Sequence, residues 1–380
     1  TMLIHKLPEE LLEYQKLARD FASRQMRKVC HGAESSDFPL ELIKAAWESG
    51  LLNMSVPEEF GGLGLGALEN CVIAEELAWG EAGIAGSIEG SEIAQCFVLT
   101  CGTKEQQAEF LSPLVDAPSL AGYGMDSGVK SSRLFYRKDG DEYFINGKHG
   151  AIVNGGVGEW YIVKAYEDRR ETPGSDEGQG AYFIVPGSED GLEFDGPLAK
   201  VGKKSQMIAP ARFDEVLVPA GNMLGAPGQV QEIYNKVLVK IYPMIASGMV
   251  GIARSAMEHA LKYAKERKTF GQMIGAYQGV SFMLADMAKD IEAARLLVYQ
   301  AAQLADMQKP SIPEALCAKA FAQEMAMRVT TDAVQVFGGY GFSKEYPVEK
   351  LMRDAKVGQL TEGTSESIKV AMGRELVTSI

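Results

Sequence analysis

Apolar residues recur at helical spacing through the first part of the chain. Between Pro8 and Val29 they include positions 11, 14, 17, 18 and 21, which share one face of a helix. Residues 39–50 show the same period, and further helices are predicted at about 68–79 and 87–101. The run 57–66 lies between these helices, and its four glycines predict a loop with unusual dihedrals or close backbone approach.

Between about residues 120 and 220 the pattern changes to that of β-strands. Short runs rich in β-branched and aromatic residues alternate with Gly, Asp and Pro, which is typical of strands joined by tight turns. Residues 139–141 read Asp-Gly-Asp, a hairpin signal, and residues 169–180 are polar and glycine-rich, which predicts an exposed loop. The predicted strands are 134–136, 142–147, 160–163, 181–185 and 212–219.

The helical period returns at about residue 229 and continues in three long segments, 229–266, 276–308 and 312–337. Ser311 is a candidate N-cap for the third segment, Pro313 fits its first turn, and Gly338-Gly339 ends it. Long helices with wide apolar faces predict a four-helix bundle, one that also packs against copies of itself.

The two changes of period divide the chain into three predicted domains. These are an N-terminal helical domain over residues 1–119, a middle β-domain over 120–224 and a C-terminal helical bundle over 225–380. The fold class is therefore mainly α with an inserted β-domain.

Composition narrows the possible functions. The chain has 380 residues and a net charge of −13, which argues against a nucleic-acid surface but allows a local basic pocket. The five cysteines lack metal-site or redox spacing and are expected to be buried free thiols, and no metal site is predicted. No secretory leader and no 18-residue apolar run is recognised, so no membrane contact and a cytoplasmic location are expected.

One carboxylate near the C-terminus has a setting that suggests chemistry. Glu362 stands directly before a Gly-Thr-Ser turn and after a basic, amphipathic segment. A single Glu in a turn usually faces solvent, so these residues alone do not make it catalytic.

Several runs, in this order and at this spacing, resemble the acyl-CoA dehydrogenase family, in its short- and medium-chain branch. The resemblance covers nearly the whole chain and implies helical N-terminal and C-terminal domains around a β-barrel-like middle domain. It also implies a homodimer or homotetramer. The runs are 57–66, 141–148, 266–271, 332–341 and 353–365.

The resemblance implies a reaction and its residues. Glu362 would be the base that removes the proton α to a CoA thioester, and FAD would accept the β-hydride. Gly363 would let the backbone N–H of Glu362 reach the thioester carbonyl. Tyr242 and Tyr340 would lie near the substrate, and an electron-transfer flavoprotein would take the electrons.

The resemblance also implies FAD contacts, many of them supplied across a dimer interface. An Arg suits a pyrophosphate, a Phe packs on a flat ring, and glycines permit close backbone approach. The residues are Arg267, Thr269, Phe270, Gln278, Gln335, Gly338, Gly339 and Thr364.

Three stretches of the middle domain depart from the family pattern, all on the side that grips the flavin ring. The stretch 125–132 lacks the family's T-E-P-x-A-G-S-D pattern, Ala151-Ile152-Val153 replaces W-I-T, and 206–209 replaces S-D-T-R. An aromatic stack and two or three hydrogen bonds, worth roughly 0.5–1.5 kcal/mol each, are lost.

These departures leave three alternatives to a conventional dehydrogenase. The chain could be a flavin-poor partner subunit of a heteromeric dehydrogenase, or a non-redox acyl-CoA lyase or isomerase. The third alternative is a non-enzymatic scaffold, against which the retained Glu362 argues. FAD binding is therefore expected to be weak or absent if an alternative holds.

Overall fold

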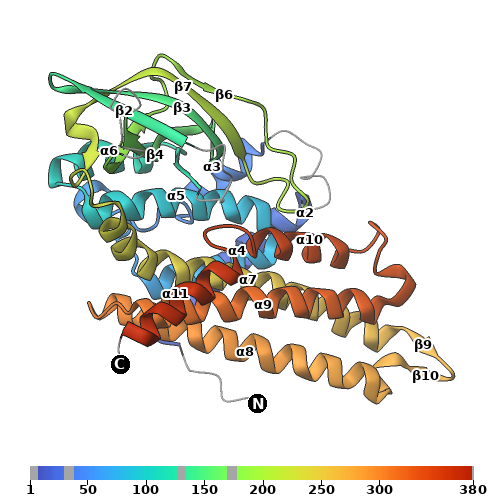
Figure 1. Ribbon diagram of the computed structural model, residues 1–380. Helices are drawn as coiled ribbons and strands as arrows, with labels where there is room; N and C mark the ends of the chain where they lie inside the picture. The colour runs from blue at the N-terminus through green and yellow to red at the C-terminus, as the bar shows by residue number, and fades with distance from the viewer. Residues whose placement is uncertain (1–6, 30–37, 126–132, 169–177, 379–380) are drawn as a thin grey trace.

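The computed structural model describes residues 7–29, 38–125, 133–168 and 178–378, and its first part is helical (Figure 1). Helix α1 continues through the π-helical turn η1 into α2, as expected for the segment that begins at Pro8. The capping box between Thr103 and Gln106 begins α6. The N-terminal helices are α1 (Glu9–Phe21), η1 (Ala22–Met26), α2 (Arg27–Val29), α3 (Leu40–Glu48), α4 (Ala67–Gly80), α5 (Ala82–Cys101) and α6 (Lys104–Asp116).

Helix α5 begins five residues before its predicted start at position 87. The cause lies in its N-cap residue and in two glycines of its first turns. The carboxylate of Glu81 accepts a hydrogen bond from the Ile84 N–H at 2.7 Å and caps the helix. Gly83 and Gly86 suggest a break, yet they allow a close approach. A Cβ at Gly83 would lie 2.1 Å from the Ser205 hydroxyl oxygen, and one at Gly86 would lie 2.8 Å from the Gln206 side chain.

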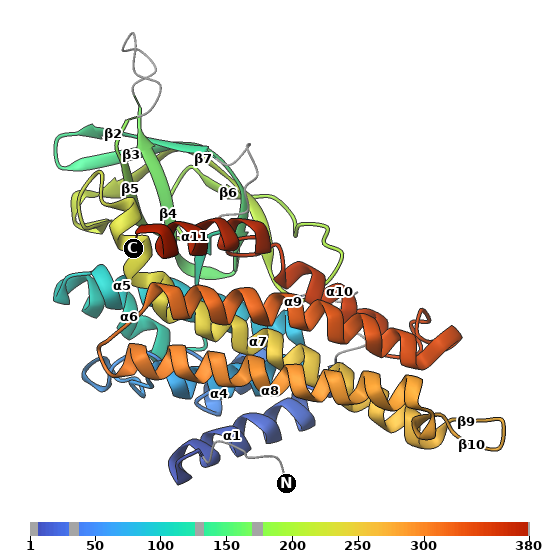
Figure 2. The ribbon, with the colours of Figure 1, turned by 60° about the horizontal axis from the view of Figure 1, so that its bottom comes forward.

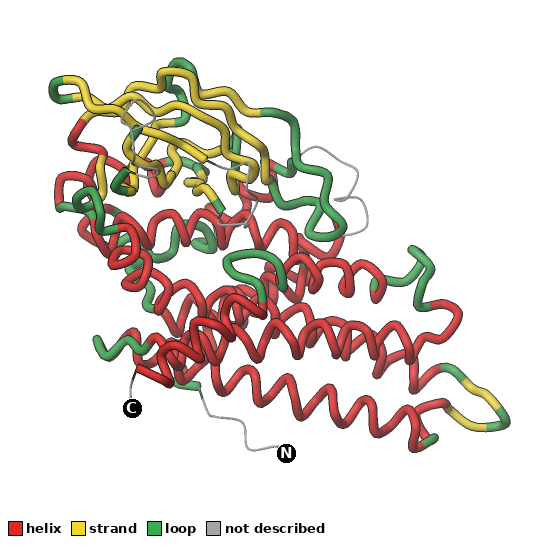
Figure 3. Tube along the Cα trace, viewed as in Figure 1, coloured by secondary structure: helices red, strands yellow, loops and turns green. Residues whose placement is uncertain are grey.

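The middle region forms an eight-stranded sheet that packs above the helices in the view of Figure 1. Neighbouring strands run in the order β6-β7-β3-β1-β4-β5-β8, and β2 pairs with both β3 and β4. The pairings therefore close on themselves through β3, β1, β4 and β2, which gives the sheet its barrel-like form (Figure 3). The strands are β1 (Leu120–Gly124), β2 (Arg133–Asp139), β3 (Glu142–Val153), β4 (Gly158–Glu167), β5 (Gly180–Pro186), β6 (Leu192–Phe194), β7 (Ile208–Pro219) and β8 (Met223–Leu224).

The sheet has its own hydrophobic core, separate from that of the helices. Alternation along β2 turns Leu134 and Tyr136 inward, where Tyr136, Tyr143 and Phe183 pack ring against ring. The predicted hairpin is confirmed, because β2 and β3 meet at Gly140 with a φ of 60°. Most of the predicted loop at 169–180 and seven residues of the stretch 125–132 lie outside the described residues.

The C-terminal part is built on three long helices that lie side by side, with α4 against α7 (Figures 1 and 2). These are α7 (Val230–Glu266), α8 (Gln278–Asp306) and α9 (Ile312–Phe337), which confirms the three predicted segments. Helices α10 (Val348–Gly358) and α11 (Ser365–Thr378) pack across α9. In the described part of the chain, α7 alone has the length and composition to cross a membrane, but 89% of its most apolar window is buried inside this protein.

The ends of α9 follow the sequence with one difference. Ser311 occupies the N-cap position and Pro313 the first turn, but the Ser311 hydroxyl bonds to the Glu314 carboxylate instead of a backbone N–H. Gly338, with a φ of 57°, ends the helix as predicted. Cys71, Cys96, Cys101 and Cys317 are free thiols, of which Cys71 is fully buried.

Candidate active site

Glu362 lies in the tight loop between α10 and α11, with an unusual backbone. Its φ is 53° and that of Gly363 is 97°, so two consecutive residues adopt left-handed conformations. A non-glycine residue in this region costs free energy, and such outliers gather at functional sites. The side chain is not at the surface: Glu362 is only 4% exposed.

A buried lysine holds this loop. Lys319, on α9, is 0% exposed. Its Nζ donates hydrogen bonds to the carbonyl oxygens of Thr361 and Gly363, each at 3.1 Å, and to that of Glu362. One turn further along α9, the Gln323 amide donates to the carbonyl of Gly358 at 2.9 Å. Helix α9 therefore fixes the carbonyls on both sides of Glu362.

Burial has an electrostatic consequence for Lys319. Removal from water lowers the pKa of its ammonium to about 7, although the charges of Glu362 and Glu89 act in the opposite direction. The lysine thus titrates near neutral pH while it holds the loop.

Tyrosines surround the Glu362 side chain. The hydroxyl of Tyr123, on β1, hydrogen-bonds to the Glu362 carboxylate, and burial together with the charges of Glu362 and Glu89 raises the pKa of Tyr123. Tyr242 and Tyr234, on α7, lie with their hydroxyl oxygens 3.0 Å apart, and the Tyr242 ring lies under the Lys319 ammonium at 4.7 Å. A carboxylate in this setting is shielded from water and can act as a base on a weak acid.

An inner cavity lies between α4, α5 and α7, and the charge of Glu89 on its wall acts on Tyr123 and Lys319 of this cluster. Its walls are mostly small apolar side chains, and its volume is about 20 Å³. Three charged residues, Glu89, Glu92 and Lys203, also line it, together with Asn70. Lys203 and Lys319 both act on the pKa of Glu89, so this cavity shares its electrostatics with the Glu362 loop.

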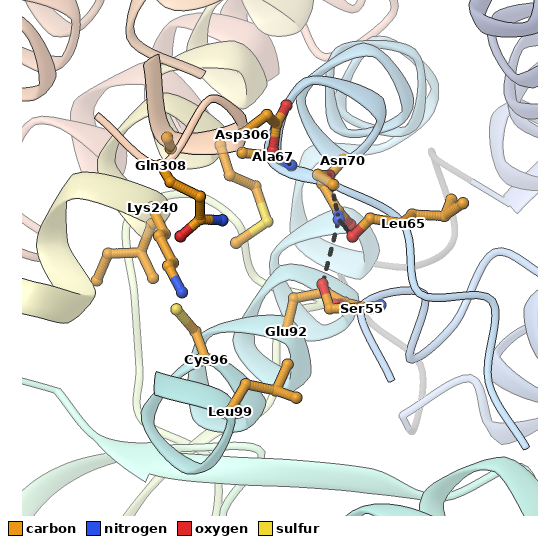
Figure 4. Close-up of a pocket in the computed structure, with 14 residues that line it drawn as sticks. Ser55, Leu65, Ala67, Asn70, Glu92, Cys96, Leu99, Lys240, Asp306 and Gln308 are labelled. Atoms are coloured by element: carbon orange, nitrogen blue, oxygen red, sulfur yellow. Dashed lines mark hydrogen bonds between the residues drawn. The ribbon is translucent and has the colours of Figure 1, made fainter. Parts of the chain in front are cut away.

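An outer cavity of about 170 Å³ adjoins the inner one and shares Asn70, Glu92 and Met244 with it. Figure 4 shows Lys240 and Cys96 close together on its wall, and Asn70, which donates a hydrogen bond to the Ser55 hydroxyl at 3.1 Å. Glu92 accepts hydrogen bonds from the backbone N–H groups of Met54 and Ser55.

The structure separates the predicted site residues into two places. Glu362, Gly363, Thr364 and Tyr242 gather at the loop just described. The other predicted residues lie at the end of the bundle, beside the hairpin of β9 (Lys268–Thr269) and β10 (Gln272–Met273) (Figures 1 and 2). Eighteen residues of α9 separate Lys319 from Phe337, a distance of about 27 Å along a helix. The residues at the bundle end are Arg267, Thr269, Phe270, Gln278, Gln335, Gly338, Gly339 and Tyr340.

The bundle end is exposed and aromatic. Phe270 lies between β9 (Lys268–Thr269) and β10 (Gln272–Met273) with a φ of 48°, and it is 99% exposed. Behind it, Tyr263 stacks on Phe337 with ring centroids 4.3 Å apart, and Tyr346 contacts both rings. Within one chain these side chains do not reach the Glu362 loop.

Two described stretches of the middle domain lack the side chains that contact the flavin ring in the family pattern. Where the family pattern has W-I-T, Ala151 and Val153 are buried, and Val153 packs on Gly90 of α5. Where the pattern has S-D-T-R, the Gln206 amide bonds to the Gly86 carbonyl at 2.9 Å, and Ile208 is buried. The described residues of one chain therefore fit the isoalloxazine ring poorly, while the bundle end retains a set that suits a pyrophosphate.

Sequence reasoning missed Lys319, Tyr123, Glu89 and Lys203. A signal existed for Lys319, because it stands between Ala318 and Ala320 on the apolar face of a predicted helix. Tyr123 and Lys203 carry no such signal, since only the packing of β1 and of the loop before β7 on the helices brings them to the site.

Comparison with known proteins gives a consistent result. Two family models match, "Acyl-CoA dehydrogenase, N-terminal domain" over residues 8–117 and "Acyl-CoA dehydrogenase, C-terminal domain" over residues 241–377. The probable acyl-CoA dehydrogenase fadE25 of Mycobacterium leprae is 35% identical, and the alignment covers 98% of this chain and 97% of that protein.

Solved structures agree. The butyryl-CoA dehydrogenase of Megasphaera elsdenii superposes with a TM-score of 0.91 at 33% identity, over 99% of this chain and 100% of that one. A chain in the structure described as the electron transferring flavoprotein of Acidaminococcus fermentans gives a TM-score of 0.91 at 32% identity, over 98% of this chain and 99% of that one.

Proposed function

The chain belongs to the acyl-CoA dehydrogenase family of oxidoreductases, and from that premise we propose that Glu362 removes the α-proton of a CoA thioester. The observation that carries the proposal is the position of Glu362. Its carboxylate is buried, hydrogen-bonded to Tyr123 and mounted on a loop whose carbonyls Lys319 holds. A solvent-facing Glu in a turn would need none of this support.

The same loop supports polarisation of the thioester carbonyl. In a trans peptide the N–H points opposite to the C=O, and no cis peptide is present in the described residues. Because Lys319 binds the carbonyls of Thr361 and Glu362, the N–H groups of Glu362 and Gly363 point away from it. A thioester oxygen placed against those donors would be stabilised as negative charge develops on it.

In the conventional reaction of the family, FAD supplies the acceptor for the β-hydride, and an electron-transfer flavoprotein then takes the electrons. For this chain, Arg267 and Thr269 at the bundle end are the residues proposed to contact the pyrophosphate of a flavin held mainly by a second copy. That arrangement requires a homo-oligomer. The residues of the Glu362 loop carry only the proton half of this reaction.

The non-redox alternative has specific support. Ala151 and Val153 offer no side-chain donor to a flavin ring, and the Tyr123 hydroxyl already contacts the Glu362 carboxylate. A lyase or isomerase needs a proton acceptor and a proton donor, and no electrons leave the substrate. Glu362 would take the α-proton, and it or Tyr123 would return a proton at another atom. The other alternative, a flavin-poor partner subunit, is supported by the same two residues, Ala151 and Val153, at the position where the family pattern contacts the flavin ring.

Exchange of the α-proton tests the base without reference to redox chemistry. Butyryl-CoA is incubated with the protein in D₂O, and loss of the α-proton signal is followed by NMR. We expect Glu362→Gln to slow exchange by about 10²–10⁴-fold, the usual contribution of a general base. Glu366→Gln, four residues on and exposed, is the matched control and should exchange at the wild-type rate. Equal rates in the wild type and Glu362→Gln would overturn the assignment.

The visible absorption spectrum then distinguishes a conventional dehydrogenase from the two flavin-poor alternatives. Protein purified with about one FAD per chain, whose yellow colour butyryl-CoA bleaches, is a conventional dehydrogenase. Colourless protein that exchanges the α-proton but binds no added FAD is a non-redox enzyme. Colourless protein that exchanges nothing alone and gains activity with a flavin-bearing relative is a partner subunit.

A further inference from the structure

The inner cavity between α4, α5 and α7 contains a lysine in an unexpected place. Lys203 is only 7% exposed and has a φ of 44°, a left-handed conformation that a side chain with a Cβ adopts at a cost. An ordinary solvated lysine requires neither burial nor this backbone. Such an outlier persists only where the surrounding structure enforces it.

The surrounding structure fixes Lys203 through its backbone. Its N–H donates a hydrogen bond to the Asp354 carboxylate at 2.5 Å, and Asp354 is itself fully buried in an ion pair with Lys350 at 2.7 Å. Lys350 also binds Glu81, the residue that caps α5. The loop before β7 is thus tied to α10 and α5, and Lys203 is one of the residues that line the cavity.

Across this cavity stands Glu89, on α5. Burial raises its pKa, and the charges of Lys203 and Lys319 lower it. The wall also contains Asn70 and Glu92, whose carboxylate already accepts backbone hydrogen bonds, and its remaining residues are apolar. The charge of Glu89 also acts on Tyr123, which contacts Glu362, so this polar pair lies next to the proposed reaction centre.

A plain alkyl group is a poor match for this cavity, because it would leave an ammonium and a carboxyl group without water or a partner. The volume of about 20 Å³ suffices for one water-sized group, and such a group needs two to four polar partners. Three carboxylates, those of Glu89, Glu92 and Glu362, lie at or near the cavity against the two lysines Lys203 and Lys319, which leaves no excess positive charge for a fourth. An uncharged oxygen function therefore fits better than a second carboxylate.

We propose that the inner cavity selects a short acyl group bearing an uncharged oxygen function, a hydroxyl or an oxo group, which Lys203 and Glu89 bind by hydrogen bonds. This specificity rests on the proposed function, since it assumes that the thioester lies at Glu362. The inner cavity is then a recognition site for a polar acyl group and not a slot for a saturated chain.

The test compares four-carbon CoA thioesters that differ only in polarity. Binding of butyryl-CoA, 3-hydroxybutyryl-CoA, 4-hydroxybutyryl-CoA and succinyl-CoA to the full-length protein is measured by titration calorimetry. We expect one of the two hydroxylated thioesters to bind at least about tenfold more tightly than butyryl-CoA, the range of a hydrogen bond to a charged group. Succinyl-CoA should bind more weakly than that hydroxylated thioester.

Two variants and one control test whether Lys203 and Glu89 cause the preference for a hydroxylated thioester. Lys203→Met keeps the length of the side chain and removes its donor, and it should reduce the hydroxyl preference to less than about twofold. Lys204→Met makes the same change at the adjacent, exposed lysine and should keep the wild-type preference. Glu89→Gln keeps the hydrogen-bonding capacity of the side chain without its charge, and it should retain most of the hydroxyl preference. Circular dichroism and the affinity for free CoA verify that each variant is folded.

The outcomes distinguish this inference from the proposed function. If butyryl-CoA binds as tightly as the hydroxylated thioesters, or if Lys203→Met keeps the preference, the specificity is wrong while the enzyme class stands. Tightest binding of succinyl-CoA likewise overturns the uncharged assignment. If no acyl-CoA binds more tightly than free CoA, the proposed function itself fails.

Discussion

The Glu362 loop and the bundle end are both turns next to α9 that contain residues with left-handed backbone conformations. They differ in how far the chain itself buries them and supports them with hydrogen bonds. At the loop, Glu362 is 4% exposed and Lys319 binds three successive carbonyls. At the bundle end, Phe270 is 99% exposed, and a Cβ added at Gly338 or Gly339 would meet nothing within 4 Å. Both places hold residues that the family resemblance marks as functional.

The difference separates what one chain completes from what it offers to another molecule. Buried hydrogen bonds within the chain stabilise the strained backbone conformation of the loop, so the loop is preorganised for proton transfer. Strain at Phe270 has no such support in the described residues, and a large exposed aromatic on a projecting hairpin is typical of an interface. The loop should therefore respond to mutation through stability and catalysis, and the bundle end through assembly.

The largest effect is expected from Lys319→Met. The change removes the buried cation that binds three carbonyls and interacts with the Glu362 carboxylate, and breaking such an arrangement costs about 3–5 kcal/mol. Urea denaturation should show this loss in the free energy of unfolding. Lys268→Met, the same substitution in the exposed hairpin, should stay within about 0.5 kcal/mol of the wild type. Equal losses at the two positions would remove the distinction between the regions.

The same lysine predicts a pH dependence. Its pKa is about 7 in the folded protein, against roughly 10.4 in an unfolded chain. Between these values the unfolded chain binds more protons, so stability rises with pH through this window, by at most about 1.4 kcal/mol per pH unit. The penalty of the buried charge is fully present below pH 7.

Unfolding free energies from pH 6 to 10 check this prediction. The difference between the wild type and Lys319→Met should widen as the pH rises from 7, because only the wild type is relieved of the buried charge. Parallel curves for the two proteins would show that Lys319 does not titrate in this range.

Much of the fold follows from periodicity, because long amphipathic segments admit few alternatives. The boundaries of α7 and α9 were predicted within a residue, since apolar spacing and the proline and glycine signals agree there. The start of α5 was not, because Gly83 and Gly86 resemble helix breakers until the loop at Ser205 and Gln206 is packed against them. Glycine in a helix is informative only when its neighbour in space is known.

The candidate site was predictable only where chemistry is local in the sequence. Glu362 and Gly363 form one short motif, and the resemblance identified them. Lys203 and Tyr123 come from separate loops and strands, so long-range packing alone brings them near Glu362. Except for Thr364, the flavin contacts that the resemblance implies lie at the bundle end, roughly 27 Å from the loop along α9.

A pair of glycine substitutions gives an intermediate effect. Gly363 has a φ of 97°, so Gly363→Ala costs about 1–2 kcal/mol of backbone strain. The strain also rotates the peptide group that follows Glu362. A Cβ there would meet only ordinary contacts, 3.4–3.5 Å away, so the cost comes from the backbone conformation. Gly339→Ala at the bundle end should be neutral within about 0.5 kcal/mol.

Two measurements decide between these glycines. Thermal unfolding reports the stability of both variants, and α-proton exchange reports the position of Glu362. Only Gly363→Ala should lower both. A Gly339→Ala variant that lost exchange activity would place the bundle end within the catalytic site of the same chain.

The smallest effect on the single chain is expected at Phe270. Its φ of 48° strains a bulky residue, and its side chain has no buried contacts to lose. Phe270→Gly should therefore leave the free energy of unfolding unchanged or raise it by up to about 1 kcal/mol. Sedimentation equilibrium should nevertheless show weaker self-association, because the aromatic anchor of the proposed interface is removed. A variant that is destabilised yet associates normally would mean that Phe270 packs within its own chain, and the bundle end would then resemble the Glu362 loop.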